Sequence, residues 1–515
     1  MMQQDKSQLK IGIILNYINI GLGNLIPIFY TPIMLVLLGQ SEYGLYKLSS
    51  SVTSYLSLIS LGIGSAVTRY LIKYRAEGNK DGEEKILGLF MIIFQIIAAA
   101  AFVIGVILTL NLDICYGNSL TDAQLTRMRI LVFLMVCNMA ISFSVSPYIS
   151  IVNAHEKFIF LQCMNILSTC IAPLLNLLVL WLGYASIGMA VSSLGMNIVV
   201  QFCYLIYIRK TLKIRAQYKD MPTYLLREIL TFSFWIFVGN VVGQLYNATD
   251  TVMIGALPAL ATTGVAVYNI GGTFNQVVFS MTTGISSLIS PKANRLVFSG
   301  ASNKDLTDLA IQVGRIQCYI ITLIVTGFIA FGRPFIQFYA GKGYEDSYWV
   351  AILMMIPNMI PLVQSVCLSI IVAQNRHRFR SLVYLGIAIV NVIGTWTLMQ
   401  YMGIIGAALM TGIALVIGQG FVMNWYYWKK TRLDIKRFWK SVGEIYILPV
   451  LLCIVTLCIS QYIDFYNIRY MMIGIIVYAF VYAVLNFLFV MNDYEKCLVM
   501  APIHKIRKKN KSSYK

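Results

Sequence analysis

The sequence predicts an all-α membrane protein whose roughly 14 spanning helices form two parallel six-helix repeats followed by two C-terminal helices. Three observations predict this class: the composition, the length of the apolar runs and an internal repeat. Of the 515 residues, 58% are hydrophobic and 12% are charged, whereas soluble domains are about half apolar and about a quarter charged. The composition therefore excludes a soluble multidomain enzyme, and it excludes intrinsic disorder, which requires low hydrophobicity.

Apolar runs long enough to cross a bilayer recur along the whole chain. A spanning helix needs about 20 mostly apolar residues, whereas a β-barrel would show short segments of alternating polarity. The first run contains Pro27 and Pro32 and has no cleavage pattern after a short core, so we expect a retained membrane helix rather than a signal peptide. The predicted spans are residues 11–38, 48–70, 86–110, 128–152, 158–182, 187–208, 229–256, 264–290, 311–331, 348–374, 382–401, 404–428, 443–461 and 471–491.

The basic residues orient these spans. The chain has 40 Lys and Arg against 21 Asp and Glu, a formal net charge of +19. Short cytoplasmic loops of membrane proteins are rich in Lys and Arg, and an N-terminus in the cytoplasm assigns most of the basic residues here to that side. Both termini are then cytoplasmic. Because topology accounts for the positive excess, we expect no nucleic-acid partner. Membrane lipids are an expected partner of the protein; the basic tail either touches anionic headgroups or, as is more common, is a solvated determinant of topology.

Cysteine and histidine give no sign of a metal site or a redox centre. The 10 Cys residues lie nearly all inside apolar runs, without a Cys-x-x-Cys pair or a Cys/His cluster at metal-ligand spacing. The sequence also has no phosphate-binding loop, zinc motif or nucleophile elbow. We therefore expect no cofactor, no metal, no disulfide framework and no enzymatic activity.

An internal repeat divides the chain. Tyr46 precedes Gly62 by 16 residues, and Tyr268 precedes Gly284 by the same 16. Further matches in the same order are Asn-Lys-Asp at 79 and 303, Asn-Met at 138 and 358, Asn-x4-Trp at 176 and 391, and Ile-Gly-x-Ala at 187 and 405. Parallel repeats of this kind are typical of transporters whose halves move around a central cavity. The predicted domains are a six-helix half at 1–215, a second half at 216–440, two appended helices at 441–491 and a basic cytoplasmic tail at 492–515.

Amide side chains recur along stripes of the predicted first, seventh and eighth helices. Spacings of three to four residues place them on one helix face. Such a set can line a hydrated cavity that binds hydroxyl groups, or it can join packed helices through hydrogen bonds. The number of positions favours the cavity, since joining two helices needs only one or two of them. The candidate cavity residues are Asn16, Asn24, Asn240, Gln244, Asn247, Asn269, Asn275 and Gln276.

Three charged residues in or near the spans are candidates for function. Asp250 is the only acid well inside a predicted span, since Glu444 stands at the edge of the span 443–461; burial of a carboxylate inside a span costs about 3 kcal/mol. Asp250 is either a coupling site for H⁺ or Na⁺ or a structural anion close to the outer surface. Arg69 and Arg315 lie just inside the cytoplasmic ends of their spans. Their guanidinium groups suit an anionic pyrophosphate headgroup, and they also suit a role as anchors that reach the membrane surface.

Several stretches resemble the start of the bacterial polysaccharide-biosynthesis exporters. These are the oligosaccharidyl-lipid flippases of the multidrug/oligosaccharidyl-lipid/polysaccharide exporter superfamily, which includes the O-antigen and capsule flippases. The resemblance covers about residues 10–490 and rests on Tyr43–Tyr46, Leu58–Ser65, Arg69-Tyr70, the basic loop Lys73–Lys80, Asp250–Gly255 with the following Gly264 and Tyr268, and the Asn-x4-Trp and Ile-Gly-x-Ala patterns.

The resemblance implies a substrate and a mechanism. The substrate would be undecaprenyl-pyrophosphate carrying an oligosaccharide, moved from the inner to the outer leaflet of the bacterial cytoplasmic membrane by alternating access, with glycan polymerase machinery as a partner. The lipid II flippases of this superfamily carry cavity arginines on the first helix. Here that helix has no charge between Ile11 and Leu38, which argues against lipid II as the substrate.

Two other functions compete with a flippase. An ion-coupled multidrug or cation antiporter would share the fold, but it predicts further acids in the cavity besides Asp250. A membrane-embedded polysaccharide polymerase or acyltransferase would need catalytic groups near the membrane surface or in sizeable outer loops. The outer loops are short and all three histidines are predicted to be cytoplasmic. The sequence therefore favours the flippase.

Overall fold

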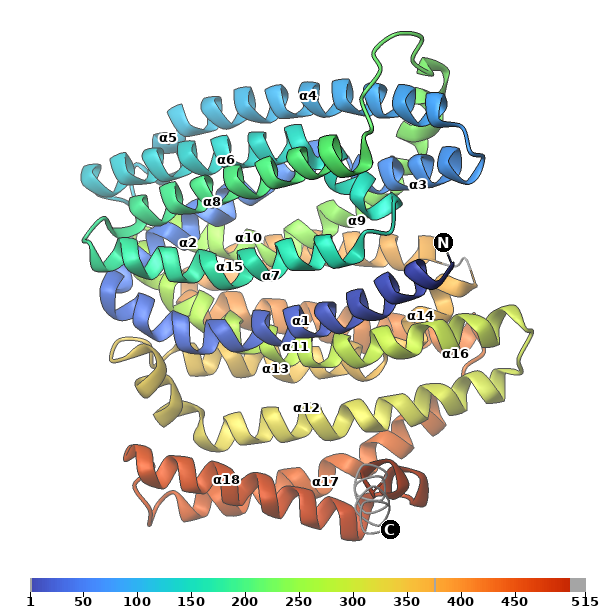
Figure 1. Cartoon of the computed structure of the whole chain (residues 1–515). Coiled ribbons are helices and arrows are strands. Elements are labelled where there is room, and N and C mark those ends of the chain that lie inside the picture. The colour runs from blue at the N-terminus through green and yellow to red at the C-terminus, as the bar shows by residue number, and fades with distance from the viewer. Residues whose placement is uncertain (1, 375–376, 501–515) are drawn as a thin grey trace, which may run out of the picture. The chain divides into compact units, whose positions relative to one another are not determined.

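The computed structural model describes residues 2–374 and 377–500, apart from the side chains of a few helical positions, and it is helical without a strand over these residues. This confirms the all-α fold class. The chain forms two compact units. The first reaches Asn269 and includes Val392–Ile404; the second consists of Ile270–Asn391 and the chain from Ile405 onward. The helices up to the unit boundary are α1 (Met2–Leu38), α2 (Gln40–Ser54), η1 (Tyr55–Ser60), α3 (Ile63–Ala76), α4 (Lys80–Leu110), α5 (Leu112–Tyr116), α6 (Asp122–Ala154), α7 (Phe158–Trp181), α8 (Ala185–Tyr207), η2 (Ile208–Leu212), η3 (Thr223–Leu225), α9 (Leu226–Asn247) and α10 (Thr249–Ala256) (Figure 1).

The boundary between the units falls inside α11 (Ala261–Phe298), whose first turns belong to the first unit. α15 also crosses it, because its middle part, from Val392 to Ile404, belongs to the first unit. The helices that follow α11 are α12 (Asn303–Ala340), α13 (Ser347–Val363), α14 (Ser365–Ala373), α15 (His377–Leu415), η4 (Val416–Met423), α16 (Asn424–Lys429), α17 (Ile435–Ile459), α18 (Ile468–Leu485) and η5 (Asn486–Val490).

Ten helical segments of the described chain are long and apolar enough to cross a membrane, or up to 12 if each of two bent pairs is one span. The protein is therefore a multi-pass membrane protein. The predicted 14 spans are compatible with this count. One 51-residue segment, Phe379–Lys429, covers two of them, and Gly403, with φ 59° and ψ −141°, breaks its helical path between the two. The predicted eighth span, residues 264–290, coincides with α11, which is not among the ten segments or the two bent pairs.

Both bent pairs have a local cause. η1 and α3 meet at Leu61 and Gly62, whose φ angles of 50° and 70° leave the helical region, and the two parts are bent by 41°. Gly62 suits this place because left-handed φ is free of strain only for glycine. α13 and α14 are bent by 46° at Gln364, after two prolines inside α13 at 357 and 361. A proline removes one helical hydrogen bond, so a kink near it is expected.

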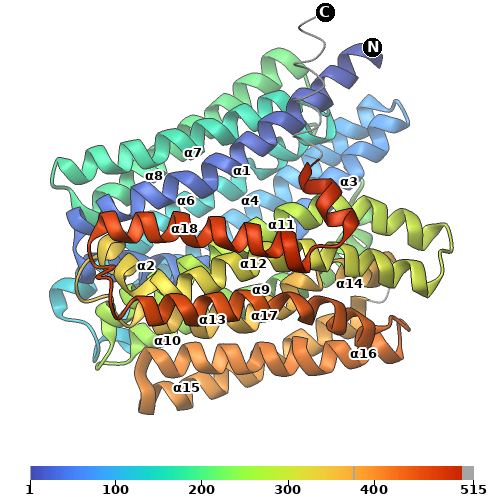
Figure 2. The ribbon, with the colours of Figure 1, turned by 90° about the horizontal axis from the view of Figure 1, so that it is seen from below.

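Each unit has its own core. In the first unit, α3 and α4 pack through large buried side chains such as Phe90 and Phe94, with Ile229 of α9 against them. In the second unit, α12 is the central helix: it contacts α13, α14, α17 and α18, and Figure 2 shows α17 and α18 running along it. Phe331 of α12 packs against Tyr478 of α18 with ring centroids 5.9 Å apart. The two C-terminal helices are thus an integral part of the second unit.

Two residue pairs from the repeat make the same kind of contact. Asn176 in α7 accepts a hydrogen bond from Ser192 of α8 at 2.7 Å. Asn391, its counterpart in α15, donates one to Thr411, beyond the break at Gly403, at 3.3 Å. In both places an amide joins two consecutive helices near their connection. These contacts support the repeat, although the boundary between the two predicted halves at 215/216 stays a prediction.

A glycine permits a close backbone approach in the first unit. A Cβ atom on Gly44 of α2 would lie 1.8 Å from the carbonyl oxygen of Thr262, in the first turn of α11. Beside it, the hydroxyl groups of Ser41 and Thr262 are 3.0 Å apart. α2 and the start of α11 therefore touch at a point where only glycine fits.

We expect Gly44→Ala to lower the free energy of unfolding by about 1–3 kcal/mol, because the added methyl group overpacks a rigid backbone contact. SDS titration of the purified protein in mixed micelles measures this. Gly64→Ala is the matched control: its Cβ would meet nothing within 4 Å, and alanine favours a helix over glycine by up to about 1 kcal/mol. Equal stability of the two variants would contradict the packing assigned to Gly44.

Candidate functional site

The predicted coupling residue, Asp250, lies at the start of a short helix. α9 ends at Asn247 and α10 begins at Thr249, so Asp250 stands in the first turn of α10, with a relative exposure of 3%. The phenolic O–H of Tyr268 in α11, also buried, donates a hydrogen bond to Oδ2 of Asp250. Negative charge is favoured in the first turn of a helix, and the phenol stabilises the carboxylate further. The site therefore accepts a buried carboxylate.

Hydroxyl and amide groups surround this turn. The hydroxyl groups of Tyr55 in η1 and Thr249 lie 2.5 Å apart. Asn269, one of the predicted cavity residues, donates to Oγ1 of Thr251 at 3.3 Å and to its own helix at 2.9 Å. Asp250 and Asn269 thus belong to one polar cluster in the first unit. The sequence had singled out Tyr268 as a repeat position and as part of the family resemblance, but not as a partner of Asp250, and it gave no sign of Tyr55.

The amides of the first helix are in part directed to protein partners. Asn24 donates to the carbonyl oxygen of Ile20 in its own helix at 2.8 Å, while Asn16 is exposed. Asn19, on the same stripe, accepts a hydrogen bond from Thr169 of α7 at 3.0 Å. One position of this stripe therefore joins two helices, and another is open to a ligand.

The remaining amides fall in two groups. On α9, Asn240 is exposed and Gln244 half-buried, whereas the side chain of Asn247 lies outside the described residues. On α11, within the second unit, Gln276 is exposed and Asn275 accepts a hydrogen bond from Asn358 of α13 at 3.1 Å. Asn16, Asn240 and Gln276 are thus the predicted cavity amides that the structure leaves exposed.

Arg69, a predicted headgroup ligand, is exposed on α3. Its guanidinium carbon lies 4.8 Å from the centroid of the Phe232 ring on α9. Stacking on an aromatic face orients a guanidinium while leaving its donors available to an anion. The guanidinium of Arg69 therefore has donors available to bind an anion.

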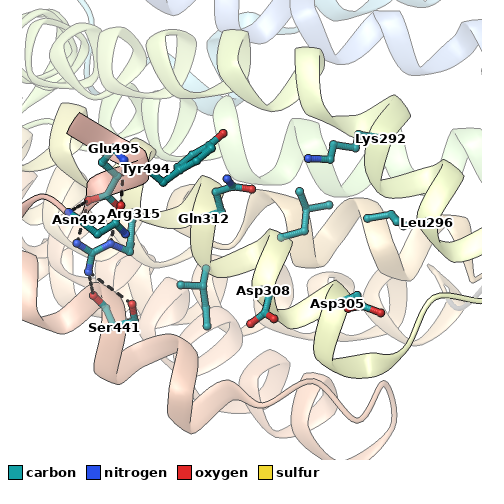
Figure 3. A pocket seen from close by; sticks show the side chains of 12 residues that line it. Lys292, Leu296, Asp305, Asp308, Gln312, Arg315, Ser441, Asn492, Tyr494 and Glu495 are labelled. Atoms are coloured by element: carbon teal, nitrogen blue, oxygen red, sulfur yellow. Dashed lines mark hydrogen bonds and ion pairs between the residues drawn. The ribbon is translucent and has the colours of Figure 1, made fainter. Parts of the chain in front are cut away.

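Arg315, the other predicted headgroup ligand, is buried in the second unit and engaged on every nitrogen. Nε donates to Glu495 at 2.5 Å, Nη1 to the carbonyl oxygen of Ser441 at 2.7 Å, and Nη2 to Glu495 and to the carbonyl oxygen of Val490, each at 3.0 Å (Figure 3). It forms one end of a cavity of about 430 Å³. A guanidinium used in this way has no donor left for a phosphate.

A second polar network, which the sequence had not indicated, holds the break between α13 and α14. Gln317 of α12 is fully buried; it donates to Ser286 of α11 at 2.7 Å and accepts from Ser365 at 3.0 Å. The preceding Gln364 donates to Asn424 of α16 at 2.6 Å. The polar side chains beside the break thus have hydrogen-bond partners inside the second unit, as buried polar groups require.

The first comparison that bears on function is a family match. A model of the polysaccharide biosynthesis protein family matches residues 9–291, more than half of the chain. The chain belongs to this family. A search of curated proteins found no significant match.

Three solved structures with a similar fold are those of a lipid flippase and two transporters. The lipid II flippase MurJ in an inward closed conformation superposes with a TM-score of 0.72 at 15% identity, covering 93% of this chain and 98% of MurJ. A mutant of the MATE transporter VcmN from Vibrio cholerae gives a TM-score of 0.57 at 15% identity, covering 84% of this chain and 98% of VcmN. A transporter of the MOP superfamily from Pyrococcus furiosus gives 0.56 at 13% identity, with 81% and 96% covered. At these identities the likeness establishes the fold.

Proposed function

We propose that this protein is a lipid-linked oligosaccharide flippase. It moves undecaprenyl-pyrophosphate-linked repeat units of O-antigen, capsule or exopolysaccharide from the cytoplasmic to the outer leaflet of the bacterial inner membrane, by alternating access. The observation that carries the proposal is the family match over residues 9–291, joined to a fold that a lipid flippase shares. Both termini are cytoplasmic in this proposal, and a glycan polymerase takes over the flipped unit.

In this proposal the polar side chains have separate roles. The exposed amides, such as Asn16, Asn240 and Gln276, can hydrogen-bond sugar hydroxyls, because an amide carries both donors and acceptors. Arg69, stacked on Phe232, meets the pyrophosphate. Asp250 binds H⁺ or Na⁺ and couples its gradient to transport. Arg315 is left out of the headgroup site, because Glu495 and two carbonyl groups occupy its donors.

Another lipid-linked oligosaccharide is preferred over lipid II because the chain departs from the pattern of the lipid II flippases, which carry cavity arginines on the first helix. α1 carries no charged side chain between Ile11 and Leu38. A multidrug or cation antiporter is the second candidate, favoured by the buried Asp250. Asp250 is the only acid well inside a predicted span that could pair with a cationic substrate, which makes the antiporter the weaker proposal.

Deletion of the gene in its host tests the proposal. We expect a complete, unpolymerised lipid-linked repeat unit to accumulate and the surface glycan to be lost, and mass spectrometry of extracted lipids identifies the unit. Wild-type protein should restore both, whereas Asn240→Leu with Gln244→Leu should restore transport at least about tenfold less well, since two hydrogen-bonding groups of about 1 kcal/mol each are removed.

Gln461→Leu is the matched control, because Gln461 is an exposed amide in the connection between α17 and α18. A deletion strain with unchanged surface glycan and raised drug sensitivity would indicate a multidrug antiporter instead of a flippase. Accumulation of the peptidoglycan precursor would move it to lipid II, and flipped units that remain unpolymerised would indicate an enzyme.

A further inference from the structure

A groove runs along the outer face of α4 in the first unit. Its volume is about 500 Å³, and it is lined by Met91, Ile92, Gln95, Ile96 and Ala99 of α4 together with Tyr218 from the connection between α8 and α9. Ile96 is 64% exposed, although it lies in the membrane-spanning segment Lys80–Leu110. The stretch from Met91 to Ala99 is about 12 Å long at helical rise. An apolar groove on a spanning helix suits an acyl chain of the bilayer.

The connection that supplies Tyr218 is fixed to α4. Its Gln217 donates a backbone hydrogen bond to the carbonyl oxygen of Glu84 at 3.0 Å, and the backbone N–H of Arg215 reaches the carboxylate of Glu84 at 3.4 Å. At Gly88 a Cβ atom would lie 1.9 Å from the carbonyl oxygen of Gln217. In Figure 1 this connection crosses α4 near its Lys80 end. The segment thus has a defined position on the helix.

The same connection carries basic side chains on its outer side. Leu212, Ile214 and Ala216 pack against the core of α3 and α4, which turns the intervening Lys213 and Arg215 outward. Lys213, Arg215 and Lys219 are exposed. Because Glu84 and Gly88 precede Met91 on α4, this basic edge stands at the end of the groove nearer to Lys80, where the span meets the lipid headgroups.

We propose that this groove binds an anionic phospholipid of the leaflet that faces the Lys80 end of α4. One acyl chain lies along Met91–Ala99, and Arg215 and Lys219 pair with the phosphate. Tyr218 separates the apolar groove from the charged edge, a place that the amphipathic tyrosine ring prefers at membrane surfaces. Basic groups at the cytoplasmic face attract anionic headgroups, whereas a zwitterionic lipid offers the same chains without net charge. The bound lipid is distinct from the transported substrate and contacts the linker between the two predicted halves.

Photo-crosslinking from position 218 tests this site. The full-length protein with Tyr218→p-benzoylphenylalanine is reconstituted in vesicles of phosphatidylglycerol and phosphatidylcholine, irradiated and analysed by mass spectrometry for lipid adducts. We expect phosphatidylglycerol adducts well above the mole fraction of that lipid. Arg215→Gln and Lys219→Gln should each reduce the enrichment about fivefold, the effect of removing one basic residue from a membrane surface.

Two further variants separate charge from shape. Lys436→Gln with Lys440→Gln removes two exposed basic residues from the start of α17 and should leave the adducts unchanged. Ala99→Trp fills the groove and should reduce adducts of both lipids. Equal capture of both lipids by the protein with native Arg215 and Lys219, or the same loss in the α17 control, would overturn the anionic site. A flippase assay on the Arg215→Gln and Lys219→Gln variants tests the proposed function independently, since neither Arg215 nor Lys219 belongs to the proposed transport site.

Discussion

Arg315→Met is expected to lower the free energy of unfolding by about 3–5 kcal/mol, because it leaves the buried carboxylate of Glu495 without its partner. The Arg315 and Glu495 side chains are 7% and 4% exposed, and their closest atoms are 2.5 Å apart. Glu495 also accepts hydrogen bonds from Tyr319 and from the backbone of Asn492, each at 3.0 Å. SDS titration in mixed micelles measures the loss.

The double variant Arg315→Met with Glu495→Leu separates the pair from the packing around it. Replacing both charges by apolar groups of similar size is often neutral or stabilising, so we expect stability near that of the wild type. Asp308→Asn is the matched control. Asp308 pairs with Arg437 at 2.7 Å, but these side chains are 44% and 49% exposed, and an exposed pair is worth about 0–1 kcal/mol.

The same pair predicts a pH dependence. Burial alone would raise the pKa of Glu495, but the hydrogen bonds from Arg315 and from the backbone at Asn492 hold this pKa below its ordinary value of 4.5. A depressed folded pKa means that the carboxylate stabilises the fold above the unfolded pKa and loses this effect as the pH falls through the folded pKa. The stability difference between wild type and Glu495→Gln should therefore be constant from about pH 7 to 5 and shrink below about pH 4.5.

Transport assays decide what Arg315 does. If it holds the C-terminal segment, the double variant transports at nearly the wild-type rate. A double variant that is stable but inactive would instead assign Arg315 to the substrate headgroup, as the resemblance to the exporters suggested.

The spans could be predicted from the sequence, because hydropathy over about 20 residues reports directly on burial in a bilayer. The breaks at Gly62 and Gln364 could not, since a window of that length averages over one or two residues with unusual φ and ψ. Pro357 and Pro361 were the sole local sign of the second break. Gly62 was visible as a repeat position, without its conformation.

The candidate site could be predicted only in part, because single residues are easier to flag than their partners. Asp250 stood out as an acid in an apolar run, but Tyr268, which donates to it, is 18 residues away in the next helix. Glu495 is 180 residues from Arg315 and lay in what the sequence assigned to a cytoplasmic tail. Such pairs depend on how helices pack, which one sequence does not disclose.

Asp250 is the residue on which ion coupling depends in the proposed function. Asp250→Asn keeps the size of the side chain and an oxygen that can accept the hydrogen bond of Tyr268, but it removes the charge and the proton-binding site. If Asp250 couples transport to H⁺ or Na⁺, flipping driven by an ion gradient should fall about tenfold or more, within the range of measured coupling energies. Flipping of a lipid-linked oligosaccharide in proteoliposomes, with an imposed pH or Na⁺ gradient, measures this.

Two variants distinguish coupling from a structural role. Asp122→Asn makes the same chemical change at an exposed acid at the start of α6 and should leave transport unchanged. Tyr268→Phe removes the hydrogen bond but keeps the acid, so the gradient should still drive transport in this variant.

A structural anion would give the opposite pattern. The free energy of unfolding of Asp250→Asn would fall by about 1–3 kcal/mol, because a buried group loses a charged hydrogen bond, while the folded fraction would still respond to the gradient. Because stability and gradient response are measured on the same protein, one outcome excludes the other, and an Asp250→Asn variant that is both stable and fully gradient-driven would remove Asp250 from either role.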